Sequence, residues 1–254
     1  RLAPLVVAKG HSSFMDYYYL LKYSESDEEW SKVMDALAVQ ETYFWREIDQ
    51  LRAVVDHVVP HLARRDHTAL RIWSVPCATG EEPLTLAMLL SEAGWFERLA
   101  IELLASDASP DAIARAKKGC YGQRAFRNLP AAMHEKYFVS HENQWRVVPE
   151  LHQRVSFDIV NLVAEDQVRR HAAAPVIFCR NVFIYFSDES IRRTIRVFER
   201  AMPAPGYLCV GASESLLRRT IAFELQEIGG AFVYVKGAPT PTPSPRLLRL
   251  ERTS

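Results

Sequence analysis

The sequence lacks a dominant charge and long apolar runs, and each absence excludes a class of protein. Its 254 residues include 31 Lys and Arg against 31 Asp and Glu, so the formal net charge is zero. Without a global field that draws it toward nucleic acid or anionic lipid, the protein must hold any partner by local patches. The apolar stretch from Val176 to Phe186 is interrupted by Arg180 and Asn181, and falls short of the roughly 20 residues that cross a bilayer. We expect no membrane insertion and no nucleic-acid partner.

Cysteine and histidine also lack the spacing of a site. The four cysteines lie far apart without a Cys-x-x-Cys pair: Cys77, Cys120, Cys179 and Cys209. This usage fits reduced, intracellular thiols better than a disulfide framework, so we expect a cytoplasmic protein. Among the eight histidines, His57 and His61 are four residues apart but lack a nearby cysteine and the HExxH pattern. We therefore assign no metal.

Hydrophobic residues make up 48% of the chain and charged residues 24%, which excludes disorder and a collagen-like architecture. At this length we expect one large or two small globular domains. Residues 1–65 have helical periodicity, and Ser26 with Glu29 forms a capping box that opens a helix. This pattern predicts a small α-helical N-terminal domain. Because the chain begins at Arg1 and not at methionine, we also expect that an upstream segment is missing.

From residue 70 onward, short β-rich runs alternate with helices, which is typical of a parallel α/β sheet. The first predicted elements are a strand in LRIWSVP (70–76), a helix in EEPLTLAMLLSEAG (81–94), a strand in LAIELLASD (99–107) and a helix opened by Ser109 and Pro110. Later in the chain we predict a buried strand PVIFCRNVFIYF (175–186) and a helix over 187–202. A strand after Pro205 and Gly206 and a hairpin around 223–225 and 231–235 complete the pattern. Between about 121 and 160 the period breaks. We interpret QWRVVPEL and RVSFDIVNL there as strands of a small β-subdomain outside the main sheet. The α/β domain thus spans 66–237, and 238–254 form a proline-rich tail that cannot pack.

The turn in SVPCATGEEP (74–83) is the first candidate ligand site. A strand ends near Val75, Gly80 makes the turn, and a helix begins at Glu81 and Glu82. In an open α/β sheet, ligands sit against such turns at the carboxyl ends of the strands. Two glutamates there would repel a pyrophosphate and favour a cationic ligand, which disfavours nicotinamide dinucleotides and nucleoside triphosphates. The alternative is that both glutamates only complement the helix dipole.

A second acidic residue ends the next strand. LAIELLASD finishes in Asp107, where an acidic side chain commonly holds ribose hydroxyls in folds that bind nucleoside cofactors. The alternative is a plain turn residue before Ser109. A glutamate for a sulfonium or ammonium group and an aspartate for a ribose together indicate S-adenosylmethionine.

Six segments resemble, in order and spacing, the CheR-type chemoreceptor glutamate methyltransferases. They are ETYFWRE (41–47), RIWSVPCATGEEPLTLAMLL (71–90), LLASDASPDAIARAKKGCYG (103–122), VSFDIVNL (155–162), FCRNVFIYF (178–186) and GYLCVGASESL (206–216). The resemblance covers nearly the whole chain to about Val235. It implies a Rossmann-like S-adenosylmethionine methyltransferase domain with a small inserted β-subdomain, preceded by a small α-helical domain. The implied enzyme moves a methyl group from S-adenosylmethionine to glutamate side chains of a chemoreceptor and releases S-adenosylhomocysteine.

The resemblance also implies roles for individual residues. Those expected to bind the cofactor are Gln40, Thr42, Arg46, Glu82, Asp107, Asn161, Leu162, Arg180 and Asn181. Glu82 would hold the methionine amino group and Asp107 the ribose. Arg46 and Tyr185 are the expected catalytic residues, and Tyr185 would face the methyl acceptor. Without the resemblance, a core aromatic position for Tyr185 and a salt bridge for Arg180 are the simpler interpretations.

The implied chemistry needs mainly alignment. A glutamate side chain has a pKa of about 4.3 and is already a carboxylate at neutral pH, so it needs no general base. The enzyme must hold this carboxylate in line with the sulfur–methyl bond, and donors such as Arg46 and Tyr185 can do so. Two alternatives stay open: a methyltransferase for another carboxylate acceptor, and a non-catalytic scaffolding module that senses S-adenosylmethionine.

Departures from the family pattern concern cofactor affinity and partners. Gln40 stands where the family commonly has Asn, and the opening segment keeps only Arg1 and Lys9 where the family usually has an arginine-rich, receptor-reading helix. The connection at 141–144 is shorter than in members that tether to a receptor's C-terminal peptide. We therefore expect the partner to be the cytoplasmic helical region of a chemoreceptor, bound without that tether. The spacer after Gly237 resembles linkers to a further domain.

Overall fold

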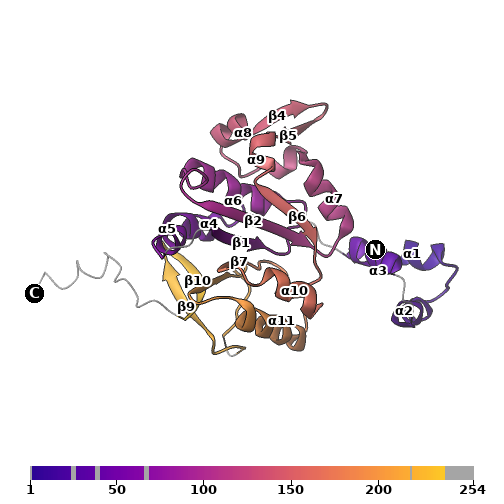
Figure 1. The fold of residues 1–254 in the computed structure, drawn as a ribbon. Helices are drawn as coiled ribbons and strands as arrows, with labels where there is room; N and C mark the ends of the chain where they lie inside the picture. The colour runs from indigo at the N-terminus through magenta and orange to yellow at the C-terminus, as the bar shows by residue number, and fades with distance from the viewer. Residues whose placement is uncertain (1, 24–26, 38–40, 66–68, 218, 238–254) are drawn as a thin grey trace, which may run out of the picture.

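A seven-stranded sheet lies at the centre of the computed structural model, which describes residues 2–23, 27–37, 41–65, 69–217 and 219–237 (Figure 1). Its strands are β1 (Ala69–Ser74), β2 (Ala100–Asp107), β6 (Val155–Ile159), β7 (Val176–Phe178), β8 (Gly206–Cys209), β9 (Phe223–Ile228) and β10 (Ala231–Lys236). They lie in the order β6-β2-β1-β7-β8-β10-β9. The first five pair in parallel, and β10 is antiparallel to both β8 and β9. The predicted α/β class and the closing hairpin are confirmed.

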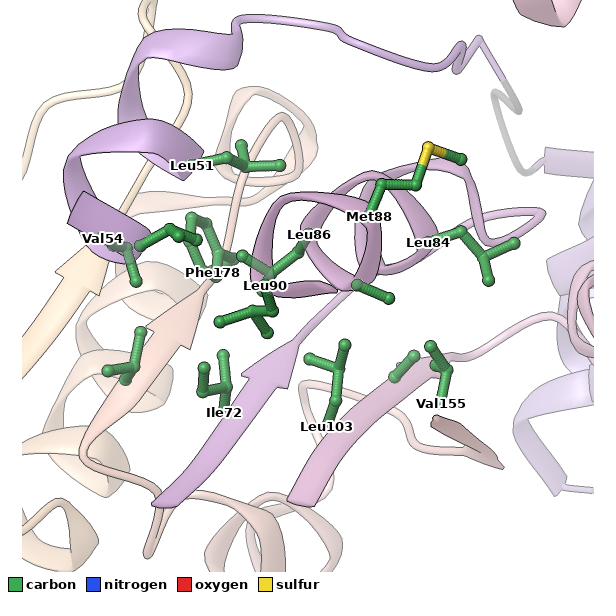
Figure 2. Packing of buried hydrophobic residues seen from close by; sticks show 14 of the residues in the cluster. Leu51, Val54, Ile72, Leu84, Leu86, Met88, Leu90, Leu103, Val155 and Phe178 are labelled. Atoms are coloured by element: carbon green, nitrogen blue, oxygen red, sulfur yellow. The ribbon is translucent and has the colours of Figure 1, made fainter. Parts of the chain in front are cut away.

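Helices cover both faces of this sheet, because its central strands carry apolar side chains on both sides. The helices are α6 (Glu81–Glu92), α7 (Pro110–Lys118), α10 (Glu165–His171) and α11 (Asp188–Ala201). Ile72 of β1 belongs to one buried cluster and its neighbour Trp73 to the other. Figure 2 shows Leu90 of α6 pointing toward Ile72 of β1, with Met88 on the side of the helix away from the strands, while Phe198 of α11 lies in the opposite cluster. The sheet is thus the middle of three layers.

The N-terminal helices divide between two cores. They are α1 (Ala3–Ala8), α2 (Phe14–Tyr23), α3 (Asp27–Leu37), α4 (Ile48–Ala53), a π-helical turn (Val54–Val58) and α5 (Val59–Ala63). Helices α1 to α3 form a small cluster around Tyr17 and Val33, and α3 lies beside α7 (Figure 1). Leu51 and Leu62, from α4 and α5, join the main core instead. Ser26, and with it the predicted capping box, lies outside the described residues.

None of the helices in the described part of the chain is long and apolar enough to cross a membrane.

A second, antiparallel sheet follows α7, with strand order β3-β5-β4. Its elements are β3 (Cys120–Tyr121), a 3-10 turn (Gln123–Phe126), α8 (Ala131–Tyr137), β4 (Phe138–His141), β5 (Gln144–Val147) and α9 (Pro149–His152). QWRV forms a strand of this sheet. The prediction that RVSFDIVNL contributes a strand to the small β-subdomain was wrong. This segment forms β6, which pairs with β2 of the main sheet, with Val155 opposite Leu103. A two-residue period predicts a strand but not the sheet that the strand joins.

The predicted buried strand over 175–186 was also too long. Strand β7 ends at Phe178, Asn181 takes a left-handed φ of 59°, and the chain then forms a 3-10 turn at Phe183–Tyr185. This apolar run therefore leaves the sheet after three strand residues. As a result Arg180, Asn181 and Tyr185 lie at the carboxyl end of a central strand.

Candidate active site

One cavity of about 890 Å³ opens at the carboxyl ends of β1, β2, β6 and β7. The sequence-predicted site residues that line it are Thr42, Arg46, Glu82, Asp107, Asn161, Leu162, Arg180, Asn181 and Tyr185. Gln40 lies outside the described residues. Five separate segments of the chain thus meet in one place. This edge of a parallel sheet is where ligands of open α/β folds bind.

The turn between β1 and α6 is held by backbone geometry. Ala78 and Gly80 take left-handed φ angles of 47° and 97°. The N–H of Cys77 donates to the carbonyl of Ser106 at 2.8 Å, and the Tyr121 hydroxyl donates to the carbonyl of Thr79 at 2.8 Å. The turn is therefore fastened to both β2 and the small sheet. A methyl group on Gly80 would come within 3.1–3.2 Å of neighbouring side chains.

We predict that Gly80→Ala lowers the free energy of unfolding by about 1–3 kcal/mol, because it adds a left-handed alanine and a steric conflict. Gly230→Ala is the matched control, since Gly230 has a φ of 85° with open space around it. Urea denaturation of both variants separates the two causes. Equal losses at the two positions would contradict a packing role for Gly80.

The two glutamates that begin α6 point to different places. Glu81 is buried, accepts a hydrogen bond from the Thr79 hydroxyl at 2.7 Å and does not line the cavity. Burial raises the pKa of Glu81 above its ordinary value, although the Thr79 hydroxyl opposes this. Glu82 does line the cavity. Only one of the two predicted glutamates is therefore placed to meet a cationic ligand.

Asp107 joins the β1 turn to the start of α7. Its Oδ2 accepts from the N–H of Ala78 at 2.9 Å, and its Oδ1 accepts from the N–H of Ser109 at 2.9 Å. Burial raises the pKa of Asp107 above its ordinary value, and these two N–H groups only partly oppose it. Ser109 in turn caps α7, accepting from the N–H of Ala112, as predicted. Asp107 is thus more than a plain turn residue, because it also borders the cavity.

Arg180 bridges two carboxylates. Its Nη1 donates to Oε2 of Glu82 at 2.9 Å and its Nη2 to Oε2 of Glu47 at 3.0 Å, and its side chain is only 2% exposed. Glu82 also accepts from the Ser74 hydroxyl at 2.8 Å. The interpretation of Arg180 as a salt-bridge residue is confirmed. The residue also lines the cavity, so the two interpretations do not exclude one another.

Arg46 lines the cavity from a strained turn. Trp45 and Glu47, on either side of it, take left-handed φ angles of 69° and 45° that are costly for residues with a Cβ. The Nη1 of Arg46 donates to the carbonyl of Glu41 at 2.7 Å, and its Nε lies 3.6 Å from Oε1 of Glu47. Its guanidinium has five N–H groups, so it can hold a ligand while keeping both contacts.

Tyr185 is 61% exposed at the rim of the cavity, so the interpretation of Tyr185 as a core residue is wrong. Its neighbour Phe186 is the one that packs against the core. The loop before Tyr185 is held by Glu214, which accepts from the N–H groups of Asn181 and Phe183 at 2.8 and 2.6 Å. Sequence reasoning missed this glutamate, whose only signal was an acid after a buried strand.

Asn161 and Leu162 follow the end of β6, the edge strand of the main sheet. The Oδ1 of Asn161 accepts from the N–H of Val163 at 3.1 Å, and Leu162 is buried. Sequence reasoning also missed Trp30 and Tyr43, which line the cavity from α3 and from the segment before Arg46. A single aromatic residue in the sequence gives no signal of which cavity it borders.

The residues present fit S-adenosylmethionine. A cavity of about 890 Å³ is in the range of small-molecule sites. Glu82 retains unused acceptor capacity for an ammonium group, because a carboxylate can accept about four hydrogen bonds and the described contacts use two. Asp107 offers acceptors of the kind that ribose hydroxyls need. No group of three or more metal-ligating side chains occurs in the described part of the chain.

This fold and this site define a methyltransferase that uses S-adenosylmethionine. The family model of the CheR methyltransferase, SAM binding domain, matches residues 40–230. The chain therefore belongs to the CheR methyltransferase family, as its sequence motifs indicated.

Named relatives are similar along most of the chain. Chemotaxis protein methyltransferase 2 of Vibrio cholerae is 35% identical over 240 residues, which cover 93% of this chain and 83% of that protein. The chemotaxis protein methyltransferase of Salmonella typhimurium is 31% identical, with coverages of 89% and 78%. The probable biofilm formation methyltransferase WspC of Pseudomonas putida is 31% identical, but only 54% of that protein is covered.

Proposed function

We propose that this enzyme esterifies glutamate side chains in the cytoplasmic helical region of a chemoreceptor. S-Adenosylmethionine supplies an electrophilic methyl group: the sulfur–carbon bond breaks, a carboxylate oxygen–carbon bond forms, and the electron pair returns to sulfur. The observation that carries the proposal is one cavity lined by Glu82, Asp107, Arg46 and Tyr185, of which Tyr185 is largely exposed. The names of the relatives support a chemotaxis setting.

The proposed roles of the residues are those that the family resemblance implies, and they are supported by the presence of these residues in the lining of one cavity. Asp107 accepts from ribose hydroxyls and Glu82 from the methionine ammonium. Thr42, Asn161, Leu162, Arg180 and Asn181 complete the cofactor pocket, with Asn161 and Leu162 near the adenine. Arg46 and Tyr185 donate to the acceptor carboxylate. A donor that orients one oxygen and leaves the other free aligns the nucleophile without neutralising it.

We also propose that the enzyme needs no receptor C-terminal peptide tether. In the small sheet, His141 and Gln144 pair directly, so only Glu142 and Asn143 connect β4 and β5. A two-residue turn offers no loop that could clasp a peptide beside the edge of this sheet.

The test is transfer of labelled methyl from S-adenosylmethionine to purified receptor cytoplasmic fragments. We expect base-labile methyl esters on receptor glutamates, located by mass spectrometry, at equal rates on fragments with and without the C-terminal peptide. Fragments with Gln at the modified positions are the control and should accept no methyl. Binding of S-adenosylmethionine without any esterified carboxylate would overturn the proposal in favour of a sensing module. Esters only on a different protein would identify another carboxylate acceptor.

A further inference from the structure

Glu47 lies between the two arginines of the active site and contacts both. Its Oε1 is 3.6 Å from Nε of Arg46 and accepts from Nδ2 of Asn181 at 3.3 Å. Its Oε2 accepts from Nη2 of Arg180 at 3.0 Å and from the N–H of Ala212 at 3.3 Å. Both carboxylate oxygens are therefore occupied, by groups from three separate segments of the chain.

The local backbone keeps this carboxylate in place. Glu47 precedes α4 with a left-handed φ of 45°, and the carbonyls of Arg46 and Glu47 both accept from Nη2 of Arg180, at 3.4 and 3.2 Å. The turn that carries Arg46 is thus fastened to the segment that follows β7 by its main chain as well as by the Glu47 side chain. Glu47 itself does not line the cavity.

We propose that Glu47 is a positioning residue: it holds the guanidinium of Arg46 in the orientation that receives the acceptor carboxylate. Its negative charge balances Arg46 on one oxygen and Arg180 on the other, so the two arginines keep fixed places relative to one another. The inference rests on the proposed function, because it assigns Arg46 to the acceptor.

The proposal predicts an effect on turnover that is larger than the effect on cofactor affinity. In Glu47→Gln, Arg180 keeps Glu82 and two main-chain carbonyls, so the cofactor side of the cavity is preserved. Arg46 loses its anionic partner and faces an amide. A misplaced catalytic donor lowers kcat by about 10- to 100-fold. Glu47→Asp keeps the charge on a shorter side chain and should recover part of that loss.

The experiment compares kcat and KM of wild type, Glu47→Gln, Glu47→Asp and Glu102→Gln in the receptor-fragment assay, with active sites counted by S-adenosylhomocysteine titration. Glu102 is the matched control, since its carboxylate pairs with Arg71 at 2.6 Å at the other end of β2. We expect a loss of kcat in Glu47→Gln, partial rescue in Glu47→Asp, and wild-type kinetics in Glu102→Gln. A Glu47→Gln enzyme as fast as wild type would overturn the proposal, and so would equal losses of kcat and of S-adenosylhomocysteine affinity.

A second readout does not depend on the acceptor. The Nε–H resonance of Arg46 in a proton–nitrogen NMR spectrum should shift and exchange faster with water in Glu47→Gln than in wild type. If the wild type modifies no receptor glutamate but this resonance changes, the proposed function fails and the positioning contact stands. An unchanged resonance in an enzyme that does modify receptors would overturn the positioning role alone.

Discussion

Replacing Arg46 by alanine is expected to lower kcat for methyl transfer by about 10²- to 10³-fold, the usual effect of removing one preorganised donor from a reacting group. S-Adenosylhomocysteine should still bind, because Glu82 and Asp107 keep their hydrogen bonds when the Arg46 side chain is removed. Isothermal calorimetry with S-adenosylhomocysteine and the receptor-fragment assay measure the two quantities separately.

The physical reason is the nature of the acceptor. A carboxylate is ionised at neutral pH and has two equivalent oxygens, so its reactivity depends on how it is oriented and dehydrated. Arg46 is suited to this task, since its contacts with Glu41 and Glu47 fix one side of a planar fork. Arg46→Lys keeps the positive charge but loses the planar set of guanidinium N–H donors. We therefore expect its kcat to lie between those of Arg46→Ala and the wild type.

Arg71→Ala is the control for the loss of an arginine. Arg71 has similar exposure, 37% against 31% for Arg46, and its partner Glu102 lies far from the cavity along β2. It should leave kcat unchanged. Unchanged turnover in Arg46→Ala would contradict the catalytic role that we propose, and loss of S-adenosylhomocysteine binding in that variant would move Arg46 to the cofactor.

Local sequence chemistry predicted much of the fold and the acidic residues after β1 and β2, whereas the other site segments were predicted from the family resemblance. The cap of α7 at Ser109, the α6 start after Gly80 and the α11 start after Ser187 depend on residues within one turn of the chain, so their signals survive folding. Strand membership was predicted less well. The apolar run after β7 read as strand, but Asn181 turns it out of the sheet.

The part of the site that sequence could not predict is its ion-pair network. Glu47, Arg180 and Glu82 lie far apart in sequence, and nothing in their spacing indicates that one guanidinium would bridge two carboxylates. The charge argument treated Glu81 and Glu82 as equivalent, and only the family resemblance singled out Glu82; the helix turns Glu82 toward the cavity and buries Glu81. Long-range electrostatic contacts of this kind follow from topology and not from local pattern.

Removal of Arg180 is expected to destabilise the fold more than any other single change at the site. Arg180→Ala leaves the carboxylates of Glu82 and Glu47 without their buried partner, and breaking such a pair costs about 3–5 kcal/mol. A loss of that size lowers Tm by roughly 6–20 °C in a protein of this length. Differential scanning calorimetry checks the value. The double variant Arg180→Met with Glu82→Gln should recover part of the lost stability, because it also removes the carboxylate of Glu82 that would otherwise be left without its partner.

The loss of unfolding free energy in Arg180→Ala should also depend on pH. Although burial opposes ionisation of Glu47, Arg180 and the donors of Ala212 and Asn181 outweigh it and hold the pKa of Glu47 below its ordinary value of 4.5. A lowered folded pKa stabilises the wild type above the unfolded value, and this contribution is lost as pH falls through the folded pKa. In Arg180→Ala, burial is no longer offset by the guanidinium and raises the pKa of Glu47. Protonation of Glu47 therefore removes the cost of a partly buried carboxylate that has lost its partner. The difference in unfolding free energy should therefore be greatest near neutral pH. It should begin to narrow above pH 4.5, as Glu47 of the variant takes up a proton at its raised pKa, and narrow further below about pH 4.5, where the wild type loses the contribution of its lowered pKa. A difference that stays constant, or widens on acidification, would show that Arg180 stabilises the fold by packing and not through its carboxylate partners.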